Sequence, residues 1–303
     1  MHKNRKDIKM DKEYHGIYAA LVTPYTKSGE VNYVELKKLI NYLIEKGIDG
    51  FYVGGSTAET FLLSNEERKK ILEIVVDANH GRKKVICHTG AISTDQAIDF
   101  ANHARTAGAD AISAISPFYY KFSDKEITDY YHDIMNATDL PMFIYNFPNF
   151  SGFALTQDIL DELMQHENLI GIKFTSSDFF MLEQIKTNHP NLIVWNGFDE
   201  MLAAGLMMGA DGGVGSTYNC MCPLIHKIYD SFHSGNMEEA QKYQKQANHV
   251  IKAICNHGVF ASIKTILGFE GFEFNGCRRP FAAMTEKGRE ELRGVYEKYI
   301  MDK

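Results

Sequence analysis

One lysine lies inside a segment that otherwise predicts a buried β-strand, LIGIKFTSS at 169–177. Side chains alternate between the two faces of a strand, and one face here collects the apolar residues Ile170, Ile172 and Phe174. Lys173 lies on the opposite face, which in a helix-covered parallel sheet looks into the interior. Desolvation there lowers the pKa and makes a lysine a nucleophile toward a carbonyl carbon. The alternative is a strand-end lysine whose ammonium group reaches solvent or pairs with a carboxylate.

A glycine-rich turn, Gly54-Gly55-Ser56-Thr57, follows another predicted strand. Glycines let the backbone approach a ligand, and successive N–H groups beside hydroxyls form a site for an anion. A carboxylate fits such a site, but so does a phosphate, and the turn alone could be only a tight connection. Together with a nucleophilic lysine and a nearby phenol, the turn predicts a 2-oxo acid whose ketone reacts with Lys173.

Short β-rich apolar runs alternate with longer helical stretches at a spacing of roughly 30 residues, which is typical of repeated βα units. The predicted strands are 16–24, 50–55, 84–88, 111–116, 141–146, 169–175, 192–196 and 212–216. The predicted helices that follow them are 34–46, 65–79, 94–107, 124–136, 156–165, 179–188, 200–208 and 224–233. Three further helices are predicted at 236–255, 259–267 and 285–300.

Consecutive βα units in this number predict an α/β fold, a (β/α)8 TIM barrel with a C-terminal three-helix extension. A doubly wound open sheet is the alternative, but it would need a glycine-rich turn after its first strand, where this chain has Thr23-Pro24-Tyr25. We expect residues 1–15 to be a loose tail, 16–234 to be the barrel and 235–303 to be the helical extension.

Chemistry in such a barrel lies where the strands end. The polar residues at those ends are Ser56, Thr57, Tyr119, Tyr120, Tyr145, Lys173, Thr175, Asp199, Glu200, Ser216 and Thr217. Each also has a purely structural interpretation, since a tyrosine in an apolar strand can be core and an Asp-Glu pair at a helix start can be a cap. Their convergence at one rim is what favours a functional role.

Composition excludes several classes of partner. The formal charge of -7 argues against nucleic acid, which requires a basic patch. No stretch has the roughly 18 uninterrupted apolar residues of a membrane span, and the charged N-terminal run has no apolar signal core. The five cysteines are odd in number and lack metal-ligand spacing, which predicts free thiols, no metal site and a cytoplasmic location.

Seven motifs spread along the chain carry a family resemblance. They are GIYAALVTPY at 16–25, GGSTAE at 54–59, PFYYKFS at 117–123, YNFPNFSG at 145–152, GIKFTSSD at 171–178, NGFDE at 196–200 and GADGGVGSTYN at 209–219. In this order they resemble the family of N-acetylneuraminate lyases and dihydrodipicolinate synthases, the class I pyruvate aldolases, and the lyase branch most. The resemblance runs from about Gly16 to beyond Pro280 and implies a barrel, a homotetramer and no metal or organic cofactor.

The same resemblance implies roles for individual residues. Lys173 would form a Schiff base, Tyr145 would relay a proton, and Ser56 with Thr57 would hold the carboxylate of the substrate. The positions that match sugar-binding residues of the lyases are Thr175, Gly197, Asp199, Glu200 and Ser216. Tyr119 matches a tyrosine that reaches into a neighbouring subunit's site and supports the proton-relay tyrosine. The implied reaction is reversible retro-aldol cleavage of N-acetylneuraminate to N-acetylmannosamine and pyruvate, with only small molecules as substrates.

Two positions depart from the family pattern. The lyases carry glycine where this chain has Ala58, and alanine is strained there if the position needs a positive φ. Phe150 stands where the synthases carry an arginine that grips the carboxylate of the second substrate, which weakens the synthase interpretation. The motifs are also compatible with an aldolase for 2-keto-3-deoxy sugar acids and with a non-catalytic barrel that binds a sugar acid.

Overall fold

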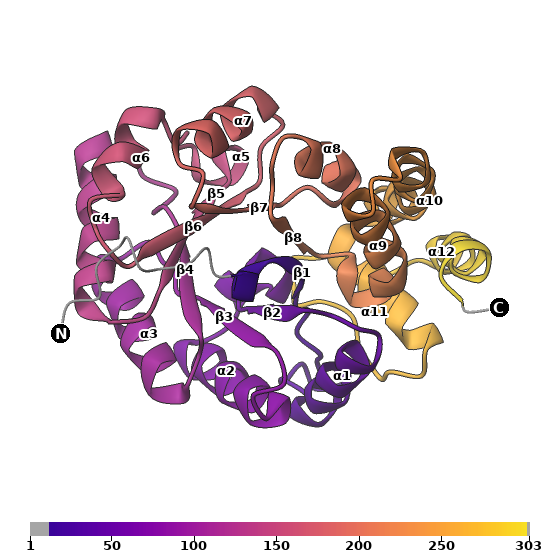
Figure 1. The fold of residues 1–303 in the computed structure, drawn as a ribbon. Coiled ribbons are helices and arrows are strands. Elements are labelled where there is room, and N and C mark those ends of the chain that lie inside the picture. Colours follow the sequence, from indigo (N-terminus) through magenta and orange to yellow (C-terminus); the bar gives the residue numbers. More distant parts are fainter. Residues whose placement is uncertain (1–11, 302–303) are drawn as a thin grey trace.

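The computed structural model describes residues 12–301, which form a closed barrel of parallel strands surrounded by helices (Figure 1). The strands are β1 Gly16–Ala20, β2 Gly50–Val53, β3 Lys84–His88, β4 Ala111–Ile115, β5 Met142–Asn146, β6 Leu169–Phe174, β7 Ile193–Asn196 and β8 Gly212–Gly215. They pair in chain order, and β8 closes the barrel against β1. The predicted (β/α)8 barrel is confirmed.

Helices cover the outside of the barrel and continue into the C-terminal extension. They are α1 Tyr33–Glu45, α2 Asn65–Asn79, α3 Thr94–Ala107, α4 Asp124–Ala137, α5 Pro148–Ser151, α6 Gln157–Leu163, α7 Phe179–Asn188, α8 Leu202–Met207, α9 Tyr218–His233, α10 Met237–Asn256, α11 Val259–Phe269 and α12 Glu286–Tyr299. Short 3-10 helices lie at η2 Lys12–Tyr14, η3 Ser56–Ala58, η4 Thr60–Leu62 and η5 Asp199–Met201. The caps Ser64, Ser123 and Thr156 accept backbone N–H groups at the starts of α2, α4 and α6.

Strand β1 ends at Ala20 rather than at residue 24, and two helices differ from the prediction by more than two residues. The helix predicted from Leu224 begins at Tyr218, because the chain passes through Pro223 with one non-helical residue, Met221, rather than starting after the proline. The short helix α5 was not predicted, since its sequence PNFS has too few residues for a helical period.

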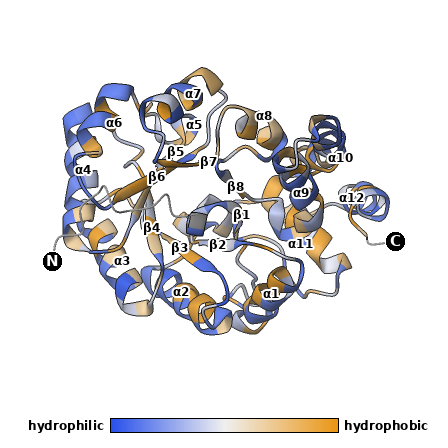
Figure 2. Cartoon of the chain, in the orientation of Figure 1, coloured by the Kyte–Doolittle hydropathy of each residue, from blue (hydrophilic) through white to orange (hydrophobic). Residues whose placement is uncertain are grey.

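Apolar side chains fill the barrel interior and the layer between the strands and the helices. The helices turn their hydrophobic sides toward the strands and their hydrophilic sides outward (Figure 2). Inside the barrel, the rings of Phe143 and Trp195 stack at 3.9 Å, and Tyr18 lies 4.7 Å from Trp195. This aromatic cluster is buried, so the side chains of the strand ends lie above a packed apolar interior.

The strand that carries Lys173 does not keep the predicted alternation throughout. The pairing of β5 with β6 shifts between Met142 and Phe143, so that Leu169 and Gly171 are their partners. A bulge of this kind turns one residue to the other face. Ile170, predicted to share the outer face, instead packs against the inner aromatic cluster, whereas Ile172 and Phe174 belong to the outer core as predicted.

Before the first strand, Lys12–Tyr14 form the short 3-10 helix η2. Most of the tail predicted at 1–15 lies outside the described residues, but from residue 12 onward the chain is a helical turn rather than a loose tail. Tyr14 is buried, its ring meets Phe143 edge-on at 5.6 Å, and its carbonyl oxygen accepts the indole N–H of Trp195 at 2.8 Å. The charged composition of this segment did not reveal that Tyr14 closes the end of the barrel where the strands begin.

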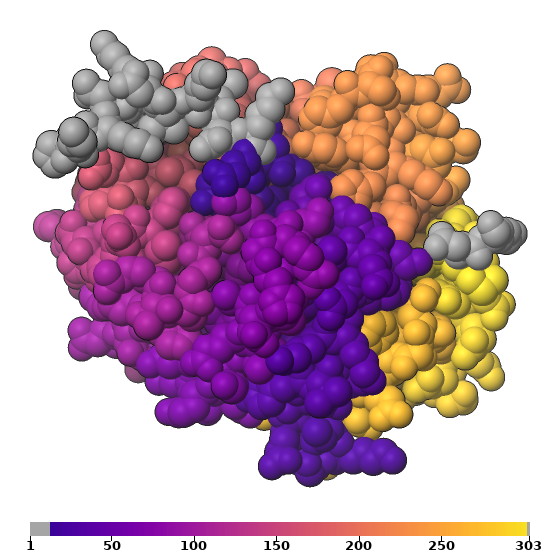
Figure 3. Space-filling model, turned by 60° about the horizontal axis from the view of Figure 1, so that its bottom comes forward, coloured from indigo at the N-terminus to yellow at the C-terminus, as the bar shows by residue number. Residues whose placement is uncertain are grey.

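The C-terminal extension lies along the side of the barrel next to α8 and α9 (Figure 1) and reaches the N-terminal part of the chain (Figure 3). Glu273 N donates to Glu35 of α1, and Asn275 Nδ2 donates to the Tyr25 carbonyl. Within residues 12–301, no single helix is long and apolar enough to span a membrane, and α10 and α11 meet that criterion only together, across a 116° bend. The five cysteines are free, as predicted.

Replacing Gly171 with alanine tests the packing inside the barrel. A Cβ at this position would lie 2.4 Å from the Phe143 ring and 2.6 Å from the Ile193 carbonyl oxygen. We expect Gly171→Ala to lower the free energy of unfolding by roughly 1–3 kcal/mol, measured by denaturant unfolding. Gly294→Ala is the matched control, because nothing lies within 4 Å of its Cβ, and it should stabilise by about 0.4–1 kcal/mol. Equal effects of the two substitutions would contradict this packing.

Candidate active site

Lys173 projects from β6 into the barrel, and only 4% of the residue is exposed. Its Nζ lies 4.0 Å from the ring centroid of Tyr52 and 4.1 Å from that of Tyr145. Burial lowers the pKa of Lys173 to about 7, and the Asp199 carboxylate partly opposes this shift. A substantial fraction of the amine is therefore neutral near pH 7, as attack on a carbonyl requires. The predicted interior position of Lys173 is confirmed.

Tyr145 lies beside Lys173 because β5 and β6 pair with these two residues in register. Burial raises the pKa of the phenol to about 12, although the nearby hydroxyls of Ser56 and Thr175 act to lower it. The phenol stays protonated at neutral pH, so it can relay a proton but is not a free base. Thr175 Oγ1 is buried and makes no hydrogen bond of normal geometry with residues 12–301, which leaves it available to a ligand.

The glycine-rich turn lies at the same end of the barrel. Gly54 has a φ of +75°, and η3 begins two residues later at Ser56. The hydroxyls of Thr57 and Ser216 lie 2.7 Å apart, which joins this turn to the residue after β8. Hydroxyls beside the N–H groups of a turn are the donors that a carboxylate needs.

The backbone strain expected at Ala58 does not occur. Ala58 lies within η3 and does not have a positive φ, whereas the next residue, Glu59, has a φ of 58° and a ψ of 36°. Alanine is therefore compatible with this turn, and the left-handed conformation belongs to the glutamate.

His88, at the end of β3, contacts the turn and was not predicted as a site residue. Its Nδ1 lies 3.0 Å from the Gly54 carbonyl oxygen, and its Nε2 accepts the N–H of Ile115 at 3.3 Å. These contacts place the proton on Nδ1, and burial lowers the pKa of His88 well below its ordinary value. The imidazole is thus neutral and adds no positive charge near Lys173. The sequence CHTG at 87–90, with a histidine at the end of a predicted strand, was the signal that could have identified His88 as a site residue.

Asp199 and Glu200 are neighbours in different environments. Asp199 is buried, and its Oδ2 accepts both the N–H and the hydroxyl of Thr217, at 2.8 and 2.7 Å. Burial raises the pKa of Asp199 to about 6, and these two hydrogen bonds oppose the shift. Glu200 is exposed. One oxygen of Asp199 therefore fixes the loop after β8, and Gln244 of α10 supports the same residue by donating to its carbonyl oxygen at 3.1 Å.

Gly197 is required by the close approach of Thr175. A Cβ on Gly197 would lie 1.9 Å from Thr175 Oγ1, so any larger residue would displace that hydroxyl. Phe150 lies on α5 and is 64% exposed, with its ring 4.2 Å from Phe147. The ring centroid of Phe147 in turn lies 5.8 Å from that of Tyr145, so Phe150 and Phe147 form a row of aromatic rings that leads from the surface to Tyr145.

Tyr119 lies exposed in the loop between β4 and α4. It is 85% exposed and has a φ of 78°, which is uncommon outside glycine. Its ring packs edge-on against Tyr120 at 5.0 Å.

Among the described residues, no three His, Cys, Asp or Glu side chains gather in a way that could hold a metal ion.

Comparison with known proteins identifies the family. The model of the dihydrodipicolinate synthetase family matches residues 13–298. The chain belongs to this family. Its sequence is 40% identical over 290 residues to the N-acetylneuraminate lyase of Shigella boydii serotype 4, covering 95% of this chain and 98% of that protein. The resemblance predicted from the motifs is confirmed.

Solved structures within the family agree closely with the barrel and its extension. The N-acetylneuraminate lyase of Fusobacterium nucleatum matches with a TM-score of 0.91 and 36% identity, over 95% of this chain and 99% of that one. CdNal of Clostridium difficile, in complex with mannosamine, matches with a TM-score of 0.93, also at 36% identity and over 95% and 99% of the two chains.

The pKa of Lys173 predicts how its reaction with pyruvate depends on pH. The rate of borohydride-trapped adduct formation should rise with pH and level off above about 7, because only the neutral amine attacks the ketone. Asp199→Asn removes a carboxylate that raises this pKa, so the midpoint should move to lower pH. Glu200→Gln, which changes an exposed carboxylate, should leave the midpoint in place. A rate that still climbs above about pH 9 would show an unshifted lysine.

Proposed function

We propose that this protein is a class I aldolase that reversibly cleaves N-acetylneuraminate into N-acetylmannosamine and pyruvate through a Schiff base on Lys173. The observation that carries the proposal is the desolvated amine of Lys173, held between the ring of Tyr52 and the phenol of Tyr145. The 40% identity to an N-acetylneuraminate lyase over nearly the whole chain supports the choice of sugar.

The reaction begins at the ketone of the open-chain substrate. The neutral amine of Lys173 attacks C2, and the resulting carbinolamine takes up one proton from solvent and loses water to give a protonated Schiff base. Ser56 and Thr57 hold the adjacent carboxylate, which fixes the ketone against the amine. The positively charged imine nitrogen is the electron sink for the next step.

Bond cleavage follows as Tyr145 relays a proton. The phenol accepts the proton of the C4 hydroxyl and passes its own proton to the substrate carboxylate, because a phenol with a pKa of about 12 does not hold a negative charge at neutral pH. The C3–C4 bond breaks, its electron pair forms the enamine, and N-acetylmannosamine leaves as the aldehyde. The relayed proton returns to C3, and water then hydrolyses the Schiff base to release pyruvate and free Lys173.

The hydroxyl-bearing chain of the substrate lies across the barrel mouth from Ser56 and Thr57. In this proposal the residues that contact the hydroxyl-bearing chain of the sugar are Thr175, Gly197, Asp199, Glu200 and Ser216. Thr175 Oγ1 is buried and makes no hydrogen bond of normal geometry with the described residues, and Glu200 is exposed at the rim. A cytoplasmic location is also part of the proposal, supported by the free cysteines.

Cleavage assays with competing substrates test the choice of reaction. Pyruvate release from N-acetylneuraminate should be faster than from a 2-keto-3-deoxy sugar acid by roughly 100-fold or more, because polar groups placed for absent hydroxyls would stay unpaired. Pyruvate and aspartate semialdehyde should give no condensation product, since Phe150 offers no guanidinium group. Faster pyruvate release from the 2-keto-3-deoxy sugar acid than from N-acetylneuraminate would contradict the assignment. Binding of the sugar without turnover would instead favour a non-catalytic barrel.

A homotetramer with Tyr119 acting across a subunit contact is the proposed assembly. Light scattering should give four times the chain mass of 34.4 kDa. Tyr119→Ala and Lys173→Ala chains should each lose activity alone and recover part of it when co-expressed, because mixed tetramers combine an intact lysine with a neighbour's intact tyrosine. Activity no higher than that of Tyr119→Ala alone would contradict action across the contact.

A further inference from the structure

Glu59 ends the carboxylate-binding turn in an unusual way. Its backbone is left-handed, with a φ of 58° and a ψ of 36°, where glycine is the ordinary residue. Its side chain is nonetheless fully buried, with 0% exposed. A buried carboxylate on a strained backbone persists only where the surroundings hold it firmly.

Two residues of the C-terminal extension hold that carboxylate. Lys264 of α11 donates from Nζ to Glu59 Oε1 at 2.5 Å, and the backbone N–H of Arg278 donates to Oε2 at 2.7 Å. The Lys264 ammonium group also donates to the Gly276 carbonyl at 2.8 Å and lies 4.3 Å from the ring centroid of Tyr25. Both buried charges are therefore paired and hydrogen-bonded.

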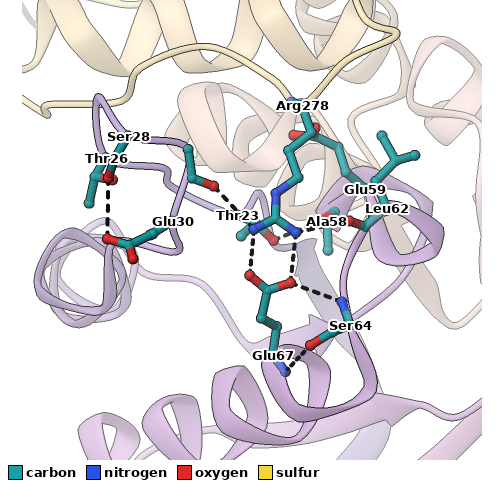
Figure 4. A network of polar contacts seen from close by, with 11 residues as sticks. Thr23, Thr26, Ser28, Glu30, Ala58, Glu59, Leu62, Ser64, Glu67 and Arg278 are labelled. Carbon is teal, nitrogen blue, oxygen red and sulfur yellow. Dashed lines mark hydrogen bonds and ion pairs between the residues drawn. The ribbon is translucent and has the colours of Figure 1, made fainter.

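The side chain of Arg278 fastens the segment that follows the turn (Figure 4). Its Nη1 donates to the Leu62 carbonyl at 2.8 Å and to Glu67 at 2.6 Å, and its Nη2 also pairs with Glu67. Nη2 further donates to the Gly29 carbonyl at 3.1 Å. The chain from the turn to the start of α2 is thus tied to the loop that precedes α12.

The constraint at Glu59 acts directly on the turn. The N–H of Glu59 donates to the Ser56 carbonyl at 3.0 Å, and the Thr23 hydroxyl donates to the Ala58 carbonyl at 2.8 Å. The three residues of η3 are therefore held between two left-handed residues, Gly54 and Glu59. Rotating the Glu59 backbone away from this conformation would reorient the N–H groups and hydroxyls of η3.

We propose that Glu59, together with Lys264 and Arg278, is a positioning residue that sets the geometry of the carboxylate-binding turn. The helical extension, remote in sequence, is thereby a working part of the pyruvate end of the site. This inference rests on the proposed function, because it assigns the turn to the carboxylate of a 2-oxo acid.

The test removes the ion pair without leaving a buried charge alone. Replacing only one partner would leave the other as an unpaired buried charge and could prevent folding. Both are therefore replaced together, as Glu59→Gln with Lys264→Met. Borohydride trapping of the Lys173 adduct is then measured against pyruvate concentration. The half-saturating pyruvate concentration should rise by about tenfold, while the trapping rate at saturating pyruvate stays near that of the unmodified protein, because Lys173 is untouched.

A second pair serves as the matched control. Lys186 Nζ and Asp211 Oδ2 lie 2.8 Å apart at the opposite end of the barrel, where the strands begin, and both are largely buried. Lys186→Met with Asp211→Asn should lower the melting temperature but leave the half-saturating pyruvate concentration unchanged. A purely structural role for Glu59 and Lys264 would give the same result as this control.

Arg278→Met provides a variant that keeps the buried pair intact. It removes the side-chain ties to Leu62, Glu67 and Gly29 and should raise the half-saturating concentration roughly threefold or more. Unchanged half-saturation in both the folded double variant and Arg278→Met would overturn the inference. Absence of trapping in the unmodified protein would instead refute the proposed function.

Discussion

The chemistry of this barrel depends on keeping one amine out of water. Lys173 lies against the faces of two tyrosines, above an interior filled by stacked aromatic rings. Aromatic faces attract a cation, but desolvation outweighs that attraction and brings the pKa of Lys173 to about 7. A neutral His88 adds no competing charge, and Asp199 keeps the pKa from falling further.

The groups around this amine come from distant parts of the chain. Tyr145 is placed by strand register, whereas the turn from Gly54 to Glu59 is held at both ends by left-handed residues and by contacts from the extension. The same extension reaches the opposite side of the mouth, where Gln244 supports the backbone of Asp199. The added helices therefore do more than cover a side of the barrel, because they hold Glu59 after β2 and Asp199 after β7.

The sequence alone predicted the barrel fold and the buried position of Lys173, because both follow from the periodicity of apolar residues. A strand period of two placed Lys173 inside, and the count of βα units placed it in β6. The same period misplaced Ile170, because a bulge in the pairing has no composition signal. Lys264 is, like Lys173, a lone lysine in an apolar run, VFASIKTILGF, but its partner Glu59 is remote in the sequence. Contacts between residues so far apart in the sequence depend on tertiary structure. The same holds for the hydrogen bond that the Thr217 hydroxyl donates to Asp199.

The most direct test of this mechanism is to identify the lysine that reacts with pyruvate. The protein is incubated with pyruvate near neutral pH, reduced with borohydride, digested and mapped by mass spectrometry. We expect a single adduct on the peptide that contains Lys173, since this amine combines burial with a lowered pKa. An adduct on Lys264 or on a surface lysine, or no adduct on the folded protein, would contradict the mechanism.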